Sequence, residues 1–401
     1  MDLETLLSDR QRFSEKLYEL MCQVNVGITG LELYEFRYAL TNITPAQGWN
    51  TIVLSKPEEL ETQISDPSFF KSIQFKPLRE GRIVLDEHIA QLTQMLFVGL
   101  VSGTYPLDWV NAHFYFDIRA FIFLVRTRHY DQAILEHFGG QPYLQFDPKQ
   151  KALESKQDLG YRELRLANQA VDEAFIAIVE LIIKTHGTPL LLTLVGPTGA
   201  GKTEIIQRMQ EVLSGKGLNT TSIEMDNFYK DGAFREGKVL DQNLIHYELF
   251  IQCMQDIQSG RQAITPRYNF LSLTSSHDME GILRPGLAPL VVSPADVVFL
   301  EGNYPFHQPE VAPLVGLKIV YLTDDDIRLK RKWRRDIDYR KKYEPVYFVN
   351  RYFRTQAIRA EAVYRPLIAV CDMLVDTSAA AIWLTKEMRT MLGSIHLDKQ
   401  G

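Results

Sequence analysis

Hydrophobic positions in the first part of the chain recur at the three- and four-residue spacing of amphipathic helices. This spacing predicts helices over residues 3–24, 85–100 and 117–137. Short β-rich runs at residues 49–54 and 73–75 lie between the first two helices. The pattern therefore predicts a mostly helical N-terminal domain over residues 1–160, and it assigns no chemistry to that domain.

The pattern changes beyond a polar, charged stretch at residues 147–158. A helical segment over residues 161–186 is predicted to connect the two parts of the chain. From residue 187 onward, short β-rich runs alternate with helical stretches. That alternation is typical of a parallel sheet flanked by helices, so we predict an α/β domain over residues 187–395.

The composition narrows the class of protein and of partner. The 401 residues are 45% hydrophobic and 23% charged, which is typical of a folded globular protein. Lys and Arg number 44 against 50 Asp and Glu, so the net charge of −6 provides no overall basic field for nucleic acid or an anionic membrane. Three widely spaced cysteines without C-x-x-C spacing argue against a disulfide framework and favour a reducing compartment.

The sequence also argues against a role at a membrane. Its first residues lack the basic and apolar regions of a secretory signal, and its longest apolar runs are too short or too interrupted to span a bilayer. We therefore expect a cytoplasmic protein with no membrane partner. The oligomeric state stays open, with a homo-oligomer among the alternatives.

The strongest chemical signal is a glycine-rich octet that follows the β-rich run at residues 190–195 and precedes a helical stretch. It matches the pattern G-x-x-x-x-G-K-[ST] at every defined position and reads Gly196-Pro197-Thr198-Gly199-Ala200-Gly201-Lys202-Thr203. In such a loop the backbone N–H groups turn inward around phosphates, the lysine reaches the outer phosphates and the threonine hydroxyl can bind Mg²⁺. The octet therefore predicts a site for a nucleoside triphosphate.

Two further predicted strands end in carboxylates. Asp226 follows the β-rich run at residues 220–225, and Glu301 follows the run at 297–300. Ligands of parallel sheets bind at the carboxyl ends of the strands, so both side chains are expected to face the phosphates. One carboxylate can accept a proton from a hydroxyl and the other can hold a metal ion. Solvent-exposed acids at strand ends are the structural alternative.

A strongly basic segment follows the predicted strand at residues 318–322. Between residues 328 and 342 there are nine basic and two acidic side chains, and the segment begins after three consecutive aspartates. A solvated helix face and a nucleic-acid patch are both alternatives. We interpret the segment as an arginine lid that closes on ATP, with Arg335 and Arg340 among its cations.

Taken in order, these motifs resemble the phosphoribulokinase/uridine kinase family over residues 187–380. Residues 225–230 look like its D-S-F-Y segment, 265–270 like its P-x-Y-D-F segment, 299–302 like its E-G segment and 324–340 like its lid. The resemblance implies a P-loop kinase that uses ATP and Mg²⁺. It also implies a catalytic base at Asp226, phosphate contacts from Lys202, Arg335 and Arg340, acceptor contacts from Tyr229, Asp241 and Tyr268, and metal ligation by Thr203 and Glu301.

Departures from the family pattern bear on the phosphoryl acceptor. Uridine kinases carry a His and an Arg where this chain has Leu273 and Ser275, and the R-G-R at the end of the lid reads Arg340-Lys341-Lys342. A polar contact to the base is therefore missing. We predict a small-molecule kinase whose acceptor is a hydroxyl of a nucleoside or pentose-like metabolite, with uridine as a poor substrate. The alternative is a nucleotide-sensing module that controls the N-terminal domain with little turnover.

Overall fold

The computed structural model divides the chain into two compact units. Unit 1 comprises Met1–Arg128, Lys151–Leu164 and Asp324–Ala360, and unit 2 comprises His129–Gln150, Arg165–Thr323 and Glu361–Gly401. The structure describes residues 2–24, 33–40, 43–65, 78–79, 82–83, 87–113, 129–146, 168–236, 238, 240, 242–303, 306, 309–323, 328, 335 and 358–392. The β-rich run predicted at residues 73–75 lies outside this description, as does the helix predicted at 117–137 up to residue 128.

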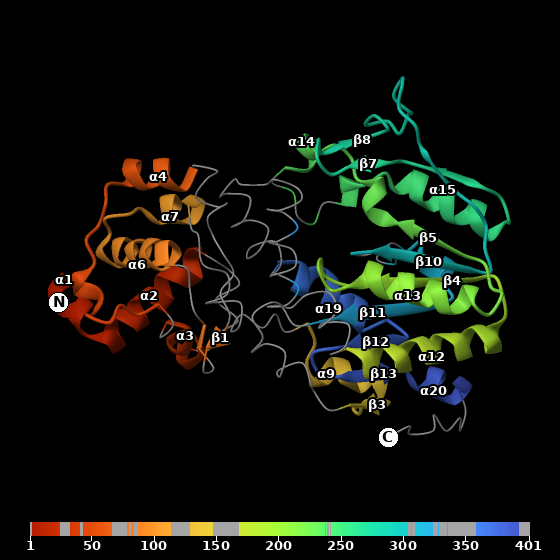
Figure 1. Cartoon of the computed structure of the whole chain (residues 1–401), viewed down its shortest axis with the longest axis horizontal. Coiled ribbons are helices and arrows are strands. Elements are labelled where there is room, and N and C mark those ends of the chain that lie inside the picture. Colours follow the sequence, from red (N-terminus) through yellow and green to blue (C-terminus); the bar gives the residue numbers. More distant parts are fainter. Residues whose placement is uncertain are drawn as a thin grey trace. The chain divides into compact units, whose positions relative to one another are not determined.

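Unit 1 is mostly helical in its described part, as the hydrophobic spacing predicts (Figure 1). The side chain of Phe13 stacks on Trp49 with 4.4 Å between ring centroids, and both are buried. Its elements are α1 (Leu3–Ser8), α2 (Arg10–Val24), α3 (Leu33–Leu40), η2 (Trp49–Thr51), α4 (Pro57–Ser65), β1 (Leu78–Arg79), β2 (Arg82–Ile83), α6 (Glu87–Ser102) and α7 (Leu107–His113).

Two local expectations in unit 1 are wrong. The single helix expected over residues 3–24 is broken at Asp9, because the Asp9 carboxylate accepts hydrogen bonds from the backbone N–H groups of Gln11 and Arg12 and so caps a new helix. The run at residues 49–54, expected as a strand, begins as the 3₁₀ turn η2. Its apolar residue Trp49 packs into the helical core instead of against a neighbouring strand.

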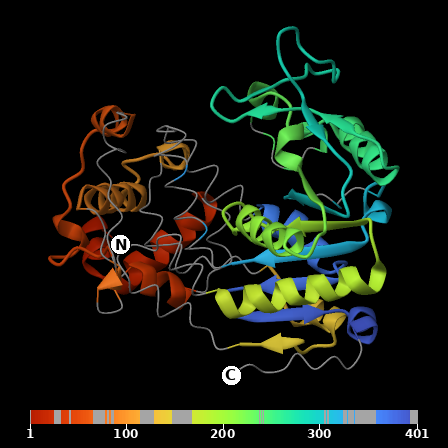
Figure 2. The same ribbon diagram turned by 45° about the vertical axis from the view of Figure 1, so that its right-hand side comes forward.

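A seven-stranded sheet organises unit 2 (Figures 1 and 2). Five neighbouring strands, β5, β10, β4, β11 and β12, run parallel, and β13 and β3 add two antiparallel strands at one edge. The α/β fold class with a mostly parallel sheet is therefore confirmed. In spatial order the strands are β5 (Thr220–Glu224), β10 (Val297–Gly302), β4 (Leu190–Val195), β11 (Leu317–Leu322), β12 (Met373–Asp376), β13 (Ala381–Leu384) and β3 (Leu144–Gln145).

Apolar side chains on the two faces of the sheet form two buried clusters. One cluster includes residues of α12 (Gln169–His186), α13 (Lys202–Ser214) and α20 (Lys386–Leu392). The other includes residues of η4 (Met225–Phe228), α15 (Tyr247–Gln258) and α19 (Arg365–Ile368). All six residues of the central strand β4 are buried, as expected for a strand covered on both faces.

Several shorter elements complete unit 2. Two antiparallel pairs, β6–β9 and β7–β8, stand apart from the main sheet. These and the remaining short elements are α9 (Gln132–Leu135), η3 (Glu136–Phe138), α14 (Gly232–Arg235), η5 (Gln242–Leu244), β6 (Ala263–Thr265), β7 (Tyr268–Asn269), β8 (Thr274–Ser275), β9 (Leu290–Val292), η6 (Ala312–Leu314) and η9 (Ala360–Tyr364), the last of which ends at the start of α19.

The units group the chain differently from the domain boundaries predicted at residues 160 and 187. Residues 129–146, called here the edge segment, belong to unit 2 because β3 pairs with β13 and the Tyr130 hydroxyl donates a 2.7 Å hydrogen bond to Asp376. Helix α12, predicted as a connector, packs on the sheet through buried side chains such as Phe175. Within the described residues, no helix is both long and apolar enough to cross a membrane.

Candidate nucleotide and acceptor site

The glycine-rich octet forms the turn between strand β4 and helix α13, as predicted. Gly199 and Gly201 have φ values of +83° and +98°, a region that side chains disfavour. A Cβ atom at Gly196 would lie 2.2 Å from the backbone oxygen of Tyr321, so only glycine fits there. The loop therefore turns sharply beside β11 and delivers Lys202 as the first residue of α13.

The Lys202 side chain folds back over the octet. It is buried, and its Nζ donates hydrogen bonds to the backbone oxygens of Gly196 at 2.8 Å and Pro197 at 3.2 Å. This places the ammonium group within the turn of the loop. A cation held there can interact with the outer phosphates of a nucleotide.

The side chains of Thr203, in α13, and Glu301, in β10, meet at the carboxyl end of the sheet. The Thr203 hydroxyl lies 2.8 Å and 3.0 Å from the two carboxylate oxygens of Glu301. Their approach follows from the parallel register of β10 and β4, in which Glu301 pairs with Leu194 and Gly302 with Val195. Hydroxyl and carboxylate oxygens are ligands that suit Mg²⁺, so these two side chains fit the metal site implied by the family resemblance.

Three carboxylates share the electrostatic field at this end of the sheet. Burial raises the pKa of Glu301, and the nearby Lys202 ammonium and Thr203 hydroxyl act in the opposite direction. Asp226 and Glu224 raise the pKa of Glu301 further, and burial and Asp226 raise the pKa of Glu224 as well. Such mutual repulsion favours the binding of a cation or a shared proton.

Asp226 lies half-buried in η4, directly after strand β5. A Cβ atom at Gly302 would lie 2.6 Å from Cβ of Met225, so the ends of β10 and η4 touch closely. Asn227 links this turn to its surroundings, since it donates to Glu224 at 3.2 Å and accepts from the backbone N–H of Tyr268 at 3.3 Å. The packing therefore brings Asp226, Glu301 and the acceptor-side strand β7 together.

The two described acceptor candidates, Tyr229 and Tyr268, lie beside each other. Their rings meet edge to face with 5.8 Å between centroids, and both are buried. Asn303 donates to the Tyr229 hydroxyl at 3.2 Å and accepts from Tyr364 at 3.2 Å. The third candidate, Asp241, lies outside the described residues.

Sequence reasoning missed two charged residues in this region. Glu224 ends strand β5 two positions before Asp226, and it joins the carboxylate group because the register of β5 and β10 pairs it with Glu301. Arg235 lies over the rings of Tyr229 and Tyr268 at 4.2 Å and 4.9 Å from their centroids. A strand register and a single arginine at the end of a four-residue helix carry no motif, so no sequence signal identifies either residue.

The predicted lid arginines do not belong to the unit that contains the glycine-rich octet. Arg335 is described and falls within unit 1, whereas the glycine-rich octet falls within unit 2. Arg340 lies outside the described residues. The phosphate-clamping role of both arginines stays a prediction.

At the two positions where uridine kinases carry a base contact, this chain makes backbone hydrogen bonds. Leu273 has a φ of +59°, and its backbone oxygen accepts a 2.7 Å hydrogen bond from Gly232. The backbone N–H of Ser275 donates to Asp231 at 2.8 Å. Both positions therefore join the hairpin β7–β8 to the segment that leads into α14.

Comparison with known proteins agrees with the family motifs. Residues 191–357 match the model of the Phosphoribulokinase / Uridine kinase family, which confirms the predicted resemblance. Over 154 residues the chain is 30% identical to uridine kinase-like protein 4 of Arabidopsis thaliana, covering 37% of this chain and 30% of that protein. Over 158 residues it is 28% identical to a uridine kinase of Leuconostoc citreum (strain KM20), covering 38% of this chain and 70% of that protein.

A solved structure also aligns with much of the chain. The D-glycerate 3-kinase of Cryptococcus neoformans var. grubii matches with 13% identity and a TM-score of 0.35, covering 52% of this chain and 97% of that one. The chain spans less than a third of the length of the two Arabidopsis uridine kinase-like proteins that share 30% and 28% identity with it.

Proposed function

We propose that this protein catalyses the ATP- and Mg²⁺-dependent transfer of the γ-phosphoryl group to a hydroxyl of a small metabolite. The observation that carries this proposal is the contact between Thr203, the last residue of the glycine-rich octet, and Glu301. It joins a nucleotide loop to a carboxylate on the neighbouring strand, which is the arrangement a Mg·ATP site requires.

The residues divide the work of transfer between them. Asp226 accepts the proton of the acceptor hydroxyl, whose oxygen then forms a bond to the γ-phosphorus while the bond to the β–γ bridging oxygen breaks and ADP leaves. Lys202 neutralises charge that spreads over the transferring group. Mg²⁺, when bound, shields the phosphate oxygens, and Thr203 and Glu301 would hold it.

The relatives and the side chain of Leu273 bear on the class of the acceptor. Curated relatives include uridine kinases, which supports a small alcohol as the acceptor. Leu273 offers a pyrimidine base only an apolar side chain, so we propose a pentose-like or smaller alcohol over uridine. We also propose that the enzyme acts in the cytoplasm. Its net charge of −6 favours a free metabolite over nucleic acid as the substrate.

An ADP-release screen over nucleosides, sugars, sugar phosphates and small hydroxy acids tests the proposal. We expect at least one alcohol to stimulate ADP release by the wild type. Lys202→Ala should lower the affinity for ATP and reduce turnover by about 100-fold or more, because the charge facing the phosphates is lost.

Lys216→Ala provides the matched control. Lys216 follows the other end of α13 and pairs with Glu180, away from the octet. Its removal should leave ATP affinity and turnover unchanged. A Lys202→Ala variant with wild-type ATP affinity and turnover would refute the site.

A further inference from the structure

A guanidinium group covers the aromatic faces on the acceptor side of the site. The Arg235 side chain lies over the rings of both Tyr229 and Tyr268, donates from Nη2 to the Tyr268 hydroxyl and donates from Nε to the backbone oxygen of Lys230 at 2.8 Å. Only 8% of Tyr229 and 5% of Tyr268 is exposed. The arginine itself is half-buried.

The backbone that carries Arg235 is fixed at the start of α14. A Cβ atom at Gly232 would lie 2.7 Å from the Leu273 side chain, and the Gly232 N–H donates to the Leu273 oxygen at 2.7 Å. Leu273 adopts a φ of +59°, which is strained for leucine and persists only where the surroundings hold it. The helix start therefore lies directly against the β7–β8 hairpin.

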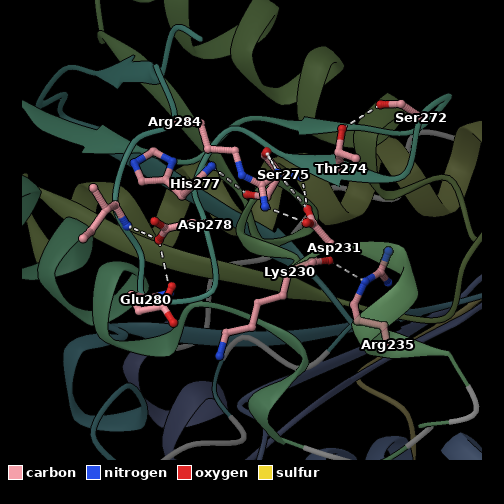
Figure 3. Close-up of polar contacts among 11 residues, drawn as sticks. Lys230, Asp231, Arg235, Ser272, Thr274, Ser275, His277, Asp278, Glu280 and Arg284 are labelled. Carbon is pink, nitrogen blue, oxygen red and sulfur yellow. Dashed lines mark hydrogen bonds and ion pairs between the residues drawn. The ribbon is translucent and has the colours of Figure 1, made fainter. Parts of the chain in front are cut away.

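An ion pair closes the same junction (Figure 3). Arg284 donates to both carboxylate oxygens of Asp231, at 2.6 Å and 3.3 Å, and to the backbone oxygen of Ser275 at 3.1 Å. Asp231 also accepts from the Ser275 N–H at 2.8 Å. We call Asp231, Arg284 and Ser275 the clamp. Because bidentate arginine–carboxylate pairs fix geometry, the clamp holds the segment that ends in Arg235.

A nucleobase gains much of its binding energy by stacking on an aromatic face. Here one guanidinium group already lies over both rings, and the face of an aromatic ring attracts such a cation. We infer that Arg235 is a specificity-determining residue that takes the place of a stacked base, so that the acceptor is an alcohol without a nucleobase. The inference rests on the proposed kinase function and narrows its substrate class.

The test compares uridine with ribose, which share the pentose and differ by the base. Uridine binding is measured by calorimetry on the full-length protein saturated with a non-hydrolysable ATP analogue and Mg²⁺. The wild type should bind uridine weakly. Arg235→Ala uncovers the tyrosine faces and should tighten uridine binding by about 10-fold or more, with ribose changed less than about 3-fold.

Two further variants make the result specific. Arg284→Gln opens the clamp and should produce a smaller gain in uridine affinity, and it carries the test if Arg235→Ala proves to be unfolded in a thermal scan. Arg261→Ala is the control, because Arg261 is an exposed arginine that pairs with Asp256 at 2.6 Å, at the end of α15. It should leave the affinities for uridine and ribose unchanged.

The outcomes separate this inference from the function on which it rests. Tight uridine binding by the wild type, or no gain in a folded Arg235→Ala or Arg284→Gln protein, would overturn the role of Arg235 even in an enzyme that phosphorylates alcohols. If no alcohol stimulates ADP release by the wild type, the proposed function fails and the specificity role fails with it. A gain in uridine affinity together with alcohol-dependent ADP release supports both.

Discussion

Among single residues, His246 has an unusual environment next to the clamp. It is 5% exposed, and its Nε2 has no hydrogen-bond partner among the described residues. Burial lowers the pKa of His246 to about 4, and the charges of Lys230 and His277 act in the same direction. The carboxylates of Asp231 and Asp278 act in the opposite direction. His246 is therefore neutral in the folded protein at neutral pH.

We predict that His246 makes the protein less stable in mild acid. An unfolded histidine takes up a proton near pH 6.5, whereas the folded one resists until about pH 4, so the unfolded state binds more protons between these values. The free energy of unfolding should fall by about 1–2 kcal/mol between pH 7 and pH 5. Urea unfolding at both pH values measures this loss.

His246→Asn should reduce that loss, since asparagine does not titrate. His186→Asn is the control, because His186 is exposed at the end of α12. Its removal should leave the pH dependence as in the wild type. Equal pH dependence in the wild type and His246→Asn would contradict the role of His246.

At the scale of elements, the edge segment is bound to the sheet by side chains as well as by β3. Tyr130 donates to Asp376 at the end of β12, and a ring nitrogen of His137 lies 2.8 Å from the backbone oxygen of Cys371. Arg389 donates to the backbone oxygen of Phe138 at 3.1 Å. These contacts make residues 129–146 part of the α/β unit despite their distance from it in sequence.

Tyr130→Phe tests how much this attachment stabilises unit 2. The change keeps the ring and removes the donor to Asp376, so we expect the free energy of unfolding to fall by about 1–2 kcal/mol. Tyr143→Phe provides the comparison, because Tyr143 is in the same segment and its described side-chain contact is made by the ring, which lies 5.7 Å from the Arg389 guanidinium and is kept in phenylalanine. Equal stability of the wild type and Tyr130→Phe in denaturant unfolding would show that the hydrogen bond contributes little.

The sequence predicted the central strands because each is a short, nearly continuous apolar run, as expected for strands that are buried on both faces. The run at residues 190–195 is confirmed as β4, and the octet after it lies where its motif requires. Strand β3 has only two residues, too few to show a period, so it could not be predicted. Arg284 and Asp231 are far apart in sequence and meet only in the fold, which is why the clamp and Arg235 left no sequence signal.

For the whole molecule, the two units divide the predicted kinase parts between them. The octet, the carboxylates and the tyrosines belong to unit 2, whereas Asp324–Ala360, which contains the predicted lid arginines Arg335 and Arg340, groups with unit 1. A kinase that uses both sets of charges needs both units. Activity should therefore be measured on the full-length protein.

The central claim is that Asp226 acts as the base of a phosphoryl transfer. The most direct test compares ATP affinity and alcohol-dependent ADP release in the wild type and in Asp226→Asn. Asp256→Asn is the control, because the Asp256 carboxylate pairs with Arg261. Asparagine keeps the size of the side chain and cannot accept the proton. We predict that Asp226→Asn binds ATP within about 2-fold of the wild type and loses about 10²–10⁴-fold in kcat. Wild-type kcat in Asp226→Asn would contradict the account.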